Sequence, residues 1–537
     1  MAMSVLPLLT VRDLWHSDEP RYAQVAREIV TGGDAVVMHV NDAIYREKPP
    51  LLFWMQAALG QWRGDVDALA ARLPSALAAL LGVLLTYAWA RRLRLGAHAF
   101  LAGALLATTF DWWWLAQRAA FDVVLATFVV AALLCEEIAR RHATRAGRLG
   151  WRLLFAVALG FGFLAKGPPV LLFGIVGHLA REWAARRTRQ LEPGWRTVAA
   201  GTSGARVARG FGEVVLQLLA FAAVLSIWIG PLWARLGFDD LLANFQRQTA
   251  GRMGEEAPHS QPFWYYLTTL PGDSLPWSLA WLVALIAAWR ARGRAMPAQH
   301  DPAAALAAPA ALSAAIDDVA ARAEARRFLL AFVLAIVALF SAIRGKRSLY
   351  LLPLQPALAL LTALLLAHLA GSAEAARRKC FRLVVASAVL LTGGALWLMP
   401  RLDAGFTLAG RTFPARSPRP LGAALAELAT PADTVVALSL RHPDSLRYYS
   451  EGERRARGLP LLAPLVLLEL PKRDDEAAAS DAARQLQELA ERRGAQLLIV
   501  CEPRDAARLP ALLHRELELL RALVSDDRDY QLLRVRG

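Results

Sequence analysis

Cysteine and charged residues are both scarce in this sequence. The 537 residues include three cysteines, Cys135, Cys380 and Cys501, which lie far apart and in no metal-ligand spacing. An odd number of distant thiols does not predict a disulfide framework or a zinc site, so we expect isolated thiols. Charged residues make up 20% of the chain and hydrophobic residues 56%, with a mean hydropathy of +0.33. Because a soluble protein of this length carries more charge and less apolar mass, the composition predicts a membrane protein.

The apolar residues are gathered in long runs between short basic stretches. A run of about 20 apolar residues can cross the roughly 30 Å hydrocarbon layer as a helix. We therefore predict ten membrane spans plus interfacial helices. The spans are expected at 67–90, 98–116, 120–139, 151–165, 167–183, 213–234, 276–290, 327–343, 348–369 and 381–399.

The loops between these runs are strongly asymmetric in charge. Counted alternately, the loops of one side hold 25 Lys and Arg residues and those of the other side hold 8. By the positive-inside rule the first set is cytoplasmic. This topology also explains the net charge of +15 without a nucleic-acid partner. The outside then contains residues 18–50, 235–275 and 345–346 and everything after Met399.

The N-terminal end does not supply an obvious means of moving residues 18–50 across the membrane. Only Met1–Ser17 precede them, with no basic start and no long apolar stretch. We expect either that translation starts upstream or that the next helix draws the segment across.

The character of the chain changes after residue 399. Short apolar runs predict buried strands at 435–440 and 497–500, and amphipathic patterns predict helices at 475–493 and 504–524. We expect a membrane domain at 1–399 and a small α/β domain at 400–537. The latter has no Gly-rich phosphate loop and no nucleophile elbow.

Candidate catalytic side chains are concentrated in the polar segment 18–50. Asp18 and Glu19 stand at the start of a predicted short helix that ends at Gly32-Gly33, and Pro49-Pro50 opens a second one. We expect both helices to lie on the membrane surface. Transfer of a sugar from a lipid phosphate to a hydroxyl needs a carboxylate base and positive charge for the departing phosphate. The alternative is that these acids are only helix caps and a surface ion pair.

Two motifs in this segment carry a family resemblance. The run Asp18-Glu19-Pro20-Arg21-Tyr22, followed by Glu47-Lys48-Pro49-Pro50-Leu51, resembles the first outside loop of GT-C-fold transferases that use polyprenyl-phosphate sugars. The chain is similar to the bacterial lipid A aminoarabinose transferases and related glycosyltransferases of families 39 and 83. Protein O-mannosyltransferases share the Asp-Glu pair but are less similar in the second motif. The similarity extends from about Leu14 to Pro356.

The resemblance implies roles for particular residues. Asp18 is the implied general base, with Glu19 beside it and Asp122 as a further catalytic acid. Glu47 and His259 are implied ligands of a divalent metal, zinc or magnesium, with orientation of Lys48 as the alternative role of Glu47. The implied donor-phosphate site consists of Lys48, Arg21, Arg252, Arg344, Lys346, Arg347 and Tyr350. The alternatives are a helix cap at Asp122, a solvated His259 and basic side chains that snorkel to lipid headgroups.

These features together predict an enzyme of the bacterial inner membrane. We expect transfer, with inversion, of a sugar from polyprenyl (undecaprenyl) phosphate to a lipid or glycolipid acceptor such as lipid A at the periplasmic face, without an organic cofactor. One alternative is a protein O-mannosyltransferase, and another is an inactive scaffold. A lipid or sugar transporter is the alternative of another class, although we find no internal repeat and the polar residues lie in loops rather than mid-span.

Overall fold

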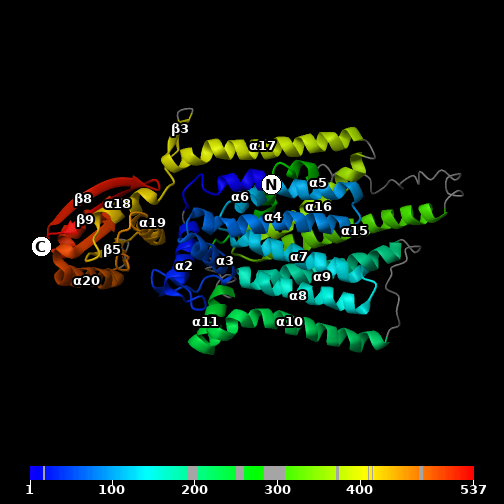
Figure 1. Ribbon diagram of the computed structural model, residues 1–537, viewed down its shortest axis with the longest axis horizontal. Coiled ribbons are helices and arrows are strands. Elements are labelled where there is room, and N and C mark those ends of the chain that lie inside the picture. Colours follow the sequence, from blue (N-terminus) through cyan, green and yellow to red (C-terminus); the bar gives the residue numbers. More distant parts are fainter. Residues whose placement is uncertain are drawn as a thin grey trace. The chain divides into compact units, whose positions relative to one another are not determined.

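The chain forms two compact units, each assembled from separate stretches (Figure 1). The computed structural model describes residues 1–15, 18–191, 204–249, 259–282, 309–370, 374–408, 411–413, 415–470 and 476–536. The first unit comprises Met1–Leu6, Arg46–Leu52 and Ser75–Thr392, and the second comprises Pro7–Tyr45, Phe53–Pro74 and Gly393–Gly537. The domain boundary predicted at residue 400 stays a prediction.

The first unit is a bundle of helices that run side by side in Figure 1. Helix α7 packs against α8 and α9, α8 against α10, α9 against α15, and α16 against both α5 and α15. Short elements join them at the ends. The long helices are α4 (Ala68–Arg92), α7 (Phe121–Arg141), α8 (Arg145–Lys166), α9 (Pro169–Leu191), α10 (Gly204–Leu236), α15 (Pro309–Ala342), α16 (Gln355–Ala370) and α17 (Glu374–Ala404). Two shorter helices, α5 (Ala99–Ala107) and α6 (Phe110–Ala116), follow each other along the chain. The short ones include α11 (Phe238–Thr249), α12 (Tyr265–Asp273) and the 3-10 helix η5 (Ser348–Leu354).

The structure supports a multi-pass membrane protein but not the predicted count of ten spans. Within the described ranges six helices are long and apolar enough to cross a membrane, or seven if the pair α5 and α6, bent by 63°, counts as one span. The six are Ala68–Arg92, Arg145–Lys166, Phe211–Leu236, Ala320–Ala342, Ser348–Leu366 and Phe381–Ala404. The predicted span 276–290 is described only to residue 282.

Two other predicted spans, α7 and α9, are continuous helices that carry charge. Glu137 of α7 and Arg181 of α9 are both buried, and the Arg181 Nε donates to Glu137 Oε2 at 2.7 Å. Arg181 also pairs with Glu324 of α15. Ionisable groups at membrane depth need partners of this kind, so these helices lie in the bundle although they are less apolar than the others.

The second unit contains a five-stranded sheet with the order β6-β5-β7-β9-β8. The strands are β5 (Thr434–Leu438), β6 (Val466–Leu468), β7 (Leu497–Cys501), β8 (Leu517–Ser525) and β9 (Arg528–Val535), of which the first three are parallel. Alternate residues along β5 face opposite sides, because strand side chains alternate. Val435 packs with α18 (Arg419–Leu428) and α19 (Pro443–Ala456), whereas Val436 packs with α20 (Glu476–Arg493) and α22 (Leu509–Leu513).

The structure differs from the sequence prediction at 504–524. Instead of one amphipathic helix it has α21 (Pro503–Ala506), α22 and then strand β8. Asp526 and Asp527 have φ of 53° and 61° and form the two-residue turn of a hairpin in which β8 pairs with β9. Such turns favour Asp and Gly, and pairing with β9 outweighs the helical spacing of the leucines. Strands β5 and β7 and helix α20 lie where strands and a helix were predicted.

Residues 18–45 of the polar segment belong to this second unit. Helix α2 (Glu19–Gly32) starts after Asp18 and ends where Gly33, at φ 75°, takes the left-handed conformation and its N–H bonds to Ile29 O at 2.9 Å. Tyr22, Val25 and Ile29 form an apolar stripe along α2, and all three are buried. They pack against protein, including α19 and Phe53 of α3 (Leu51–Arg63), so this face does not lie on lipid as predicted.

Candidate functional site

The carboxylate of Asp18 is partly exposed at the start of α2. It accepts a hydrogen bond from the Arg21 guanidinium at 2.8 Å, and both side chains retain some exposure to solvent. It makes no capping hydrogen bond with the helix backbone, although Asp18 is in the capping position. The alternative of a plain helix cap at Asp18 is therefore not supported, and its role as general base stays a prediction.

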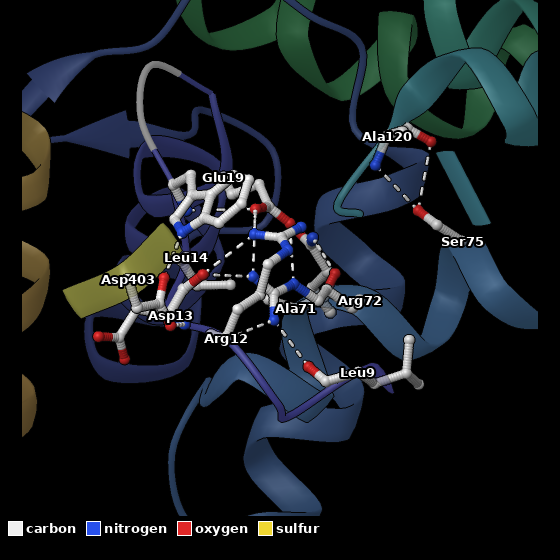
Figure 2. A network of polar contacts seen from close by, with 12 residues as sticks. Leu9, Arg12, Asp13, Leu14, Glu19, Ala71, Arg72, Ser75, Ala120 and Asp403 are labelled. Atoms are coloured by element: carbon white, nitrogen blue, oxygen red, sulfur yellow. Dashed lines mark hydrogen bonds and ion pairs between the residues drawn. The ribbon is translucent and has the colours of Figure 1, made fainter. Parts of the chain in front are cut away.

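Glu19 has entirely different surroundings, which Figure 2 shows. Its carboxylate is 1% exposed and is bound by Arg12 at 2.5 Å and by Arg72 Nε at 2.9 Å. The Arg72 guanidinium also donates to the carbonyl oxygens of Leu9, Arg12 and Asp13 at 2.7–2.9 Å. The catalytic role of Glu19 stays a prediction, but a carboxylate so enclosed by two guanidiniums is better suited to holding the start of α2 in place.

The second motif, at Glu47-Lys48, lies in the first unit and is held on both sides. Before it, the Arg46 guanidinium binds both oxygens of Asp240 in α11 at 2.9 and 3.0 Å. After it, Pro49 lies beside Gly167, since a Cβ built on Gly167 would be 4.0 Å from Pro49 Cγ. Glu47 is exposed and Lys48 is half-buried. The segment is thus fixed against the loop that follows α8.

Lys166, the last residue of α8, places a cation next to Gly167 and therefore close to the Glu47-Lys48 loop. The ammonium of Lys166 is paired with Asp122, in the first turn of α7, and lies 5.2 Å from the centroid of the Tyr350 ring. The Ser75 hydroxyl accepts from the Ala120 N–H at 3.0 Å and donates to its carbonyl at 3.2 Å, which fixes the turn that presents Asp122. The predicted residues Asp122 and Tyr350 are therefore brought together through Lys166.

Sequence reasoning did not select Lys166. The available signal was a lysine at the end of an apolar run, on the side of the membrane where basic residues are scarce. The ion pair itself joins residues that are 44 positions apart. Such a pairing depends on how α7 and α8 pack, which no local pattern indicates.

The loops around His259 and Lys346 are joined by main-chain hydrogen bonds. The Lys346 N–H donates to His259 O at 3.0 Å, the Gln261 N–H donates to Arg344 O at 3.1 Å, and Ser260 bridges Gly345. The Lys346 side chain is 4% exposed, and its ammonium donates to the Gln261 carbonyl at 2.8 Å. Burial lowers the pKa of Lys346. The burial of Lys346 and its hydrogen bond to a main-chain carbonyl favour a structural role over the predicted contact with phosphate.

The other predicted phosphate ligands are distributed around this junction. Arg344 is exposed and Arg347 is half-buried. The Arg347 carbonyl accepts from the Tyr350 N–H at 3.0 Å and from the Tyr266 hydroxyl at 3.3 Å. Arg252 lies outside the described residues.

The predicted metal ligands do not form a complete set. His259 is exposed at φ 61° and Glu47 is exposed in its own loop. Across the described parts of the chain, no group of three or more His, Cys, Asp or Glu side chains is arranged to hold a metal ion. The residues present therefore do not fit a resident metal by themselves, and the predicted metal role of Glu47 and His259 stays a prediction.

Known proteins resemble this chain over part of their sequences. A family model described as dolichyl-phosphate-mannose-protein mannosyltransferase matches residues 1–194. An undecaprenyl phosphate-alpha-4-amino-4-deoxy-L-arabinose arabinosyl transferase from Pseudomonas paraeruginosa is 32% identical over 66% of this chain and 56% of the relative. An enzyme of the same name from Edwardsiella ictaluri is 30% identical over 52% of this chain and 48% of the relative. The chain thus spans about half the length of these relatives.

Similarity in three dimensions extends further. The crystal structure of ArnT from Cupriavidus metallidurans bound to undecaprenyl phosphate matches 98% of this chain and 95% of that chain, with a TM-score of 0.66 and 19% identity. Its apo form gives a TM-score of 0.63. The predicted GT-C-like fold is therefore confirmed in its coarse form, a largely helical membrane protein, while the number of spans is not.

Proposed function

We propose that this chain is a membrane glycosyltransferase that moves a sugar from undecaprenyl phosphate to a hydroxyl group of a lipid or glycolipid acceptor. The observation that carries the proposal is the cluster of Asp122, Lys166 and Tyr350 beside the loop that bears Lys48. A half-buried set of cations and polar groups at the end of a membrane span suits a phosphate attached to a lipid. The names of the relatives support the same donor and suggest 4-amino-4-deoxy-L-arabinose as the sugar.

The reaction needs a base and a stabilised leaving group. Asp18 takes the proton of the acceptor hydroxyl as its oxygen bonds to the anomeric carbon. The bond from that carbon to the phosphate oxygen breaks in the same displacement, so the configuration inverts. The lipid phosphate leaves with one more negative charge than it carried as a diester. Lys48, Lys166 and Arg347 stabilise that charge electrostatically, and Asp122 holds Lys166 in position.

The proposed location is the periplasmic face of a bacterial inner membrane. The support is the distribution of Lys and Arg, 25 against 8, which assigns the loops of the candidate site to the side that does not face the cytoplasm. The α/β sheet follows the last span and takes the same side. No step of the mechanism is assigned to a metal. Elemental analysis of the purified protein, with activity before and after chelation, tests the predicted metal role of Glu47 and His259.

The experiment is a transfer assay with the purified chain in nanodiscs and a donor labelled in the sugar. We expect label in the acceptor lipid, and we expect Asp18→Asn to lower the rate by about 10²–10⁴-fold, the usual contribution of a general base. Asp529→Asn, an exposed change of the same kind on β9, serves as the control and keeps full activity. Unchanged transfer by Asp18→Asn contradicts the assignment of the base.

The same assay separates the alternatives. Label found in protein rather than lipid favours a protein O-mannosyltransferase, the activity named by the family model that matches residues 1–194. Movement of intact donor across the bilayer without cleavage favours a transporter.

A further inference from the structure

An exposed aromatic and basic surface lies directly after the last span and takes no part in the proposed chemistry. Helix α17 contains the candidate span Phe381–Ala404, and strand β3 (Phe406–Leu408) begins after a single intervening residue. Strand β4 (Arg411–Phe413) pairs with it, with Phe406 opposite Phe413. We call the side chains of Trp397, Phe406, Leu408, Phe413, Arg401 and Arg416 the hairpin surface.

The apolar members of the hairpin surface are open to solvent in the isolated chain. Trp397 is 47% exposed, Leu408 51% and Phe413 37%. Their rings support one another, since Phe406 stacks on Phe413 with centroids 4.8 Å apart and meets Trp397 edge-on at 6.1 Å. A preformed apolar group of this kind, beside a span and open to solvent, indicates a surface that is covered by something else.

Among the described residues, the two arginines of the hairpin surface have no carboxylate partner. Arg401 lies 4.5 Å above the Trp397 ring and Arg416 5.7 Å above the Trp15 ring, and within the described stretches neither forms an ion pair. Asp403 is the acid nearest to Arg401 in sequence, and its oxygens accept from the Trp15 indole N–H and the Asp13 N–H at 2.5 and 2.8 Å. The hairpin surface is therefore both apolar and positively charged.

We propose that the hairpin surface docks into the headgroup layer of the membrane and binds anionic phospholipids. One residue separates the span from β3, and one residue extends at most about 3.6 Å, so the hairpin cannot leave the bilayer surface. Tryptophan and other aromatic side chains are favoured at that depth. Arg401 and Arg416 then meet lipid phosphates, for which guanidinium has matched geometry.

The test places a fluorescent reporter on the hairpin of the full chain. Thr407→Cys, exposed in β3, carries an environment-sensitive dye in a background with Cys135→Ala and Cys380→Ala, while Cys501 is fully buried. Nanodiscs are made of neutral phosphatidylcholine or of a mixture with anionic phosphatidylglycerol, with a trace of spin-labelled lipid as quencher. Glu518→Cys, exposed on β8, carries the same dye as the control site.

We expect blue-shifted emission and lipid quenching at residue 407 and aqueous emission at residue 518. Docking should strengthen with phosphatidylglycerol, and each of Arg401→Gln and Arg416→Gln should weaken it about fivefold there, the value of one basic residue at an anionic surface. Aqueous, unquenched emission at 407 in both lipids overturns the proposal. Docking that is equal in neutral and anionic discs, or that appears only when a disc holds two copies of the chain, overturns it as well.

Discussion

Replacing Glu19 by glutamine separates structural from catalytic roles within the Asp18-Glu19 pair. The change keeps the shape of the side chain and removes its charge. Arg12 and Arg72, exposed by 3% and 0%, then keep two buried guanidiniums without their carboxylate. Breaking a buried ion pair from one side costs about 3–5 kcal/mol. The carbonyl oxygens of Leu9, Arg12 and Asp13 still accept from Arg72, so we expect the lower end, about 3 kcal/mol.

That loss is measurable as a shift in thermal unfolding. For a unit of roughly 200 residues, 1 kcal/mol corresponds to about 2–4 °C, so Glu19→Gln should lower the unfolding temperature by about 6–12 °C. Asp18→Asn is the matched comparison. Its ion pair with Arg21 is partly exposed, and such pairs contribute at most about 1 kcal/mol. Asp18→Asn should therefore unfold within about 4 °C of the parent and yet lose transfer activity.

The assay is unfolding of the nanodisc-embedded protein followed by tryptophan fluorescence, with transfer measured on the same samples at a temperature where all variants are folded. Glu518→Gln, an exposed change of the same type, controls for the loss of one negative charge. If Glu19→Gln unfolds with the parent, the Arg12–Glu19–Arg72 network does not hold α2. If it keeps its stability and loses transfer as Asp18→Asn does, Glu19 is catalytic.

Three further outcomes follow from contacts in the first unit. Arg46→Asp or Asp240→Arg alone should raise the KM for donor about fivefold or more by releasing the Glu47-Lys48 loop, and the double swap should restore it, which donor titration measures. Lys166→Met should lower kcat about 10²–10³-fold, as loss of one group that stabilises the leaving phosphate does, while Lys166→Arg retains part of the rate in the same transfer assay. Burial raises the pKa of Asp273 to about 6. Because the folded state then binds the proton more tightly than the unfolded state, stability should fall as the pH rises from about 4 to 6, and Asp273→Asn should flatten that profile in pH-dependent unfolding.

The local structure of the polar segment could be predicted from the sequence because its signals are short-range. Asp18 and Pro20 start α2, and Gly33 ends it by adopting a backbone conformation that other residues avoid. The apolar stripe of α2 predicted a buried face equally well. It could not indicate what covers that face, since a lipid surface and a protein surface select the same side chains.

The helix predicted at 504–524 fails for a related reason. Its leucines satisfy a helical period, but they also serve strand β8 once β9 is available as a partner. The Asp526-Asp527 pair was the one local sign of a hairpin. Non-local pairing decides between the two structures, and a pattern confined to one segment does not contain that information.

Arg27 of the second unit also shows that long-range contacts could not be predicted from a local sequence pattern. Arg27 binds both oxygens of Asp65 at 2.8 Å and the Tyr448 carbonyl at 2.7 Å, so it joins segments 38 and 421 positions away. Burial by itself would lower the pKa of Arg27, but Tyr448 and the carboxylates of Asp65 and Glu451 raise it above the ordinary value. The sequence shows Arg27 as one polar residue on an amphipathic helix. Only the fold shows that it fastens that helix to α19.

The topology predicted from the positive-inside rule does not depend on individual buried residues of this kind. Arg181 counts toward the basic side although it is buried against Glu137 and Glu324, but the asymmetry of the loops is too large to depend on one residue. On the side of the membrane where Lys and Arg are scarce, we expect each cation to be stabilised by a neighbouring polar group. The Lys346 ammonium donates a hydrogen bond to the Gln261 carbonyl, and the Lys166 ammonium pairs with Asp122. Of these two lysines, Lys166 is the one that forms an ion pair, and its ammonium lies 5.2 Å from the centroid of the Tyr350 ring. Cations on the side that the positive-inside rule disfavours are therefore the first candidates for contact with a substrate. Among them, Lys166 is the strongest candidate.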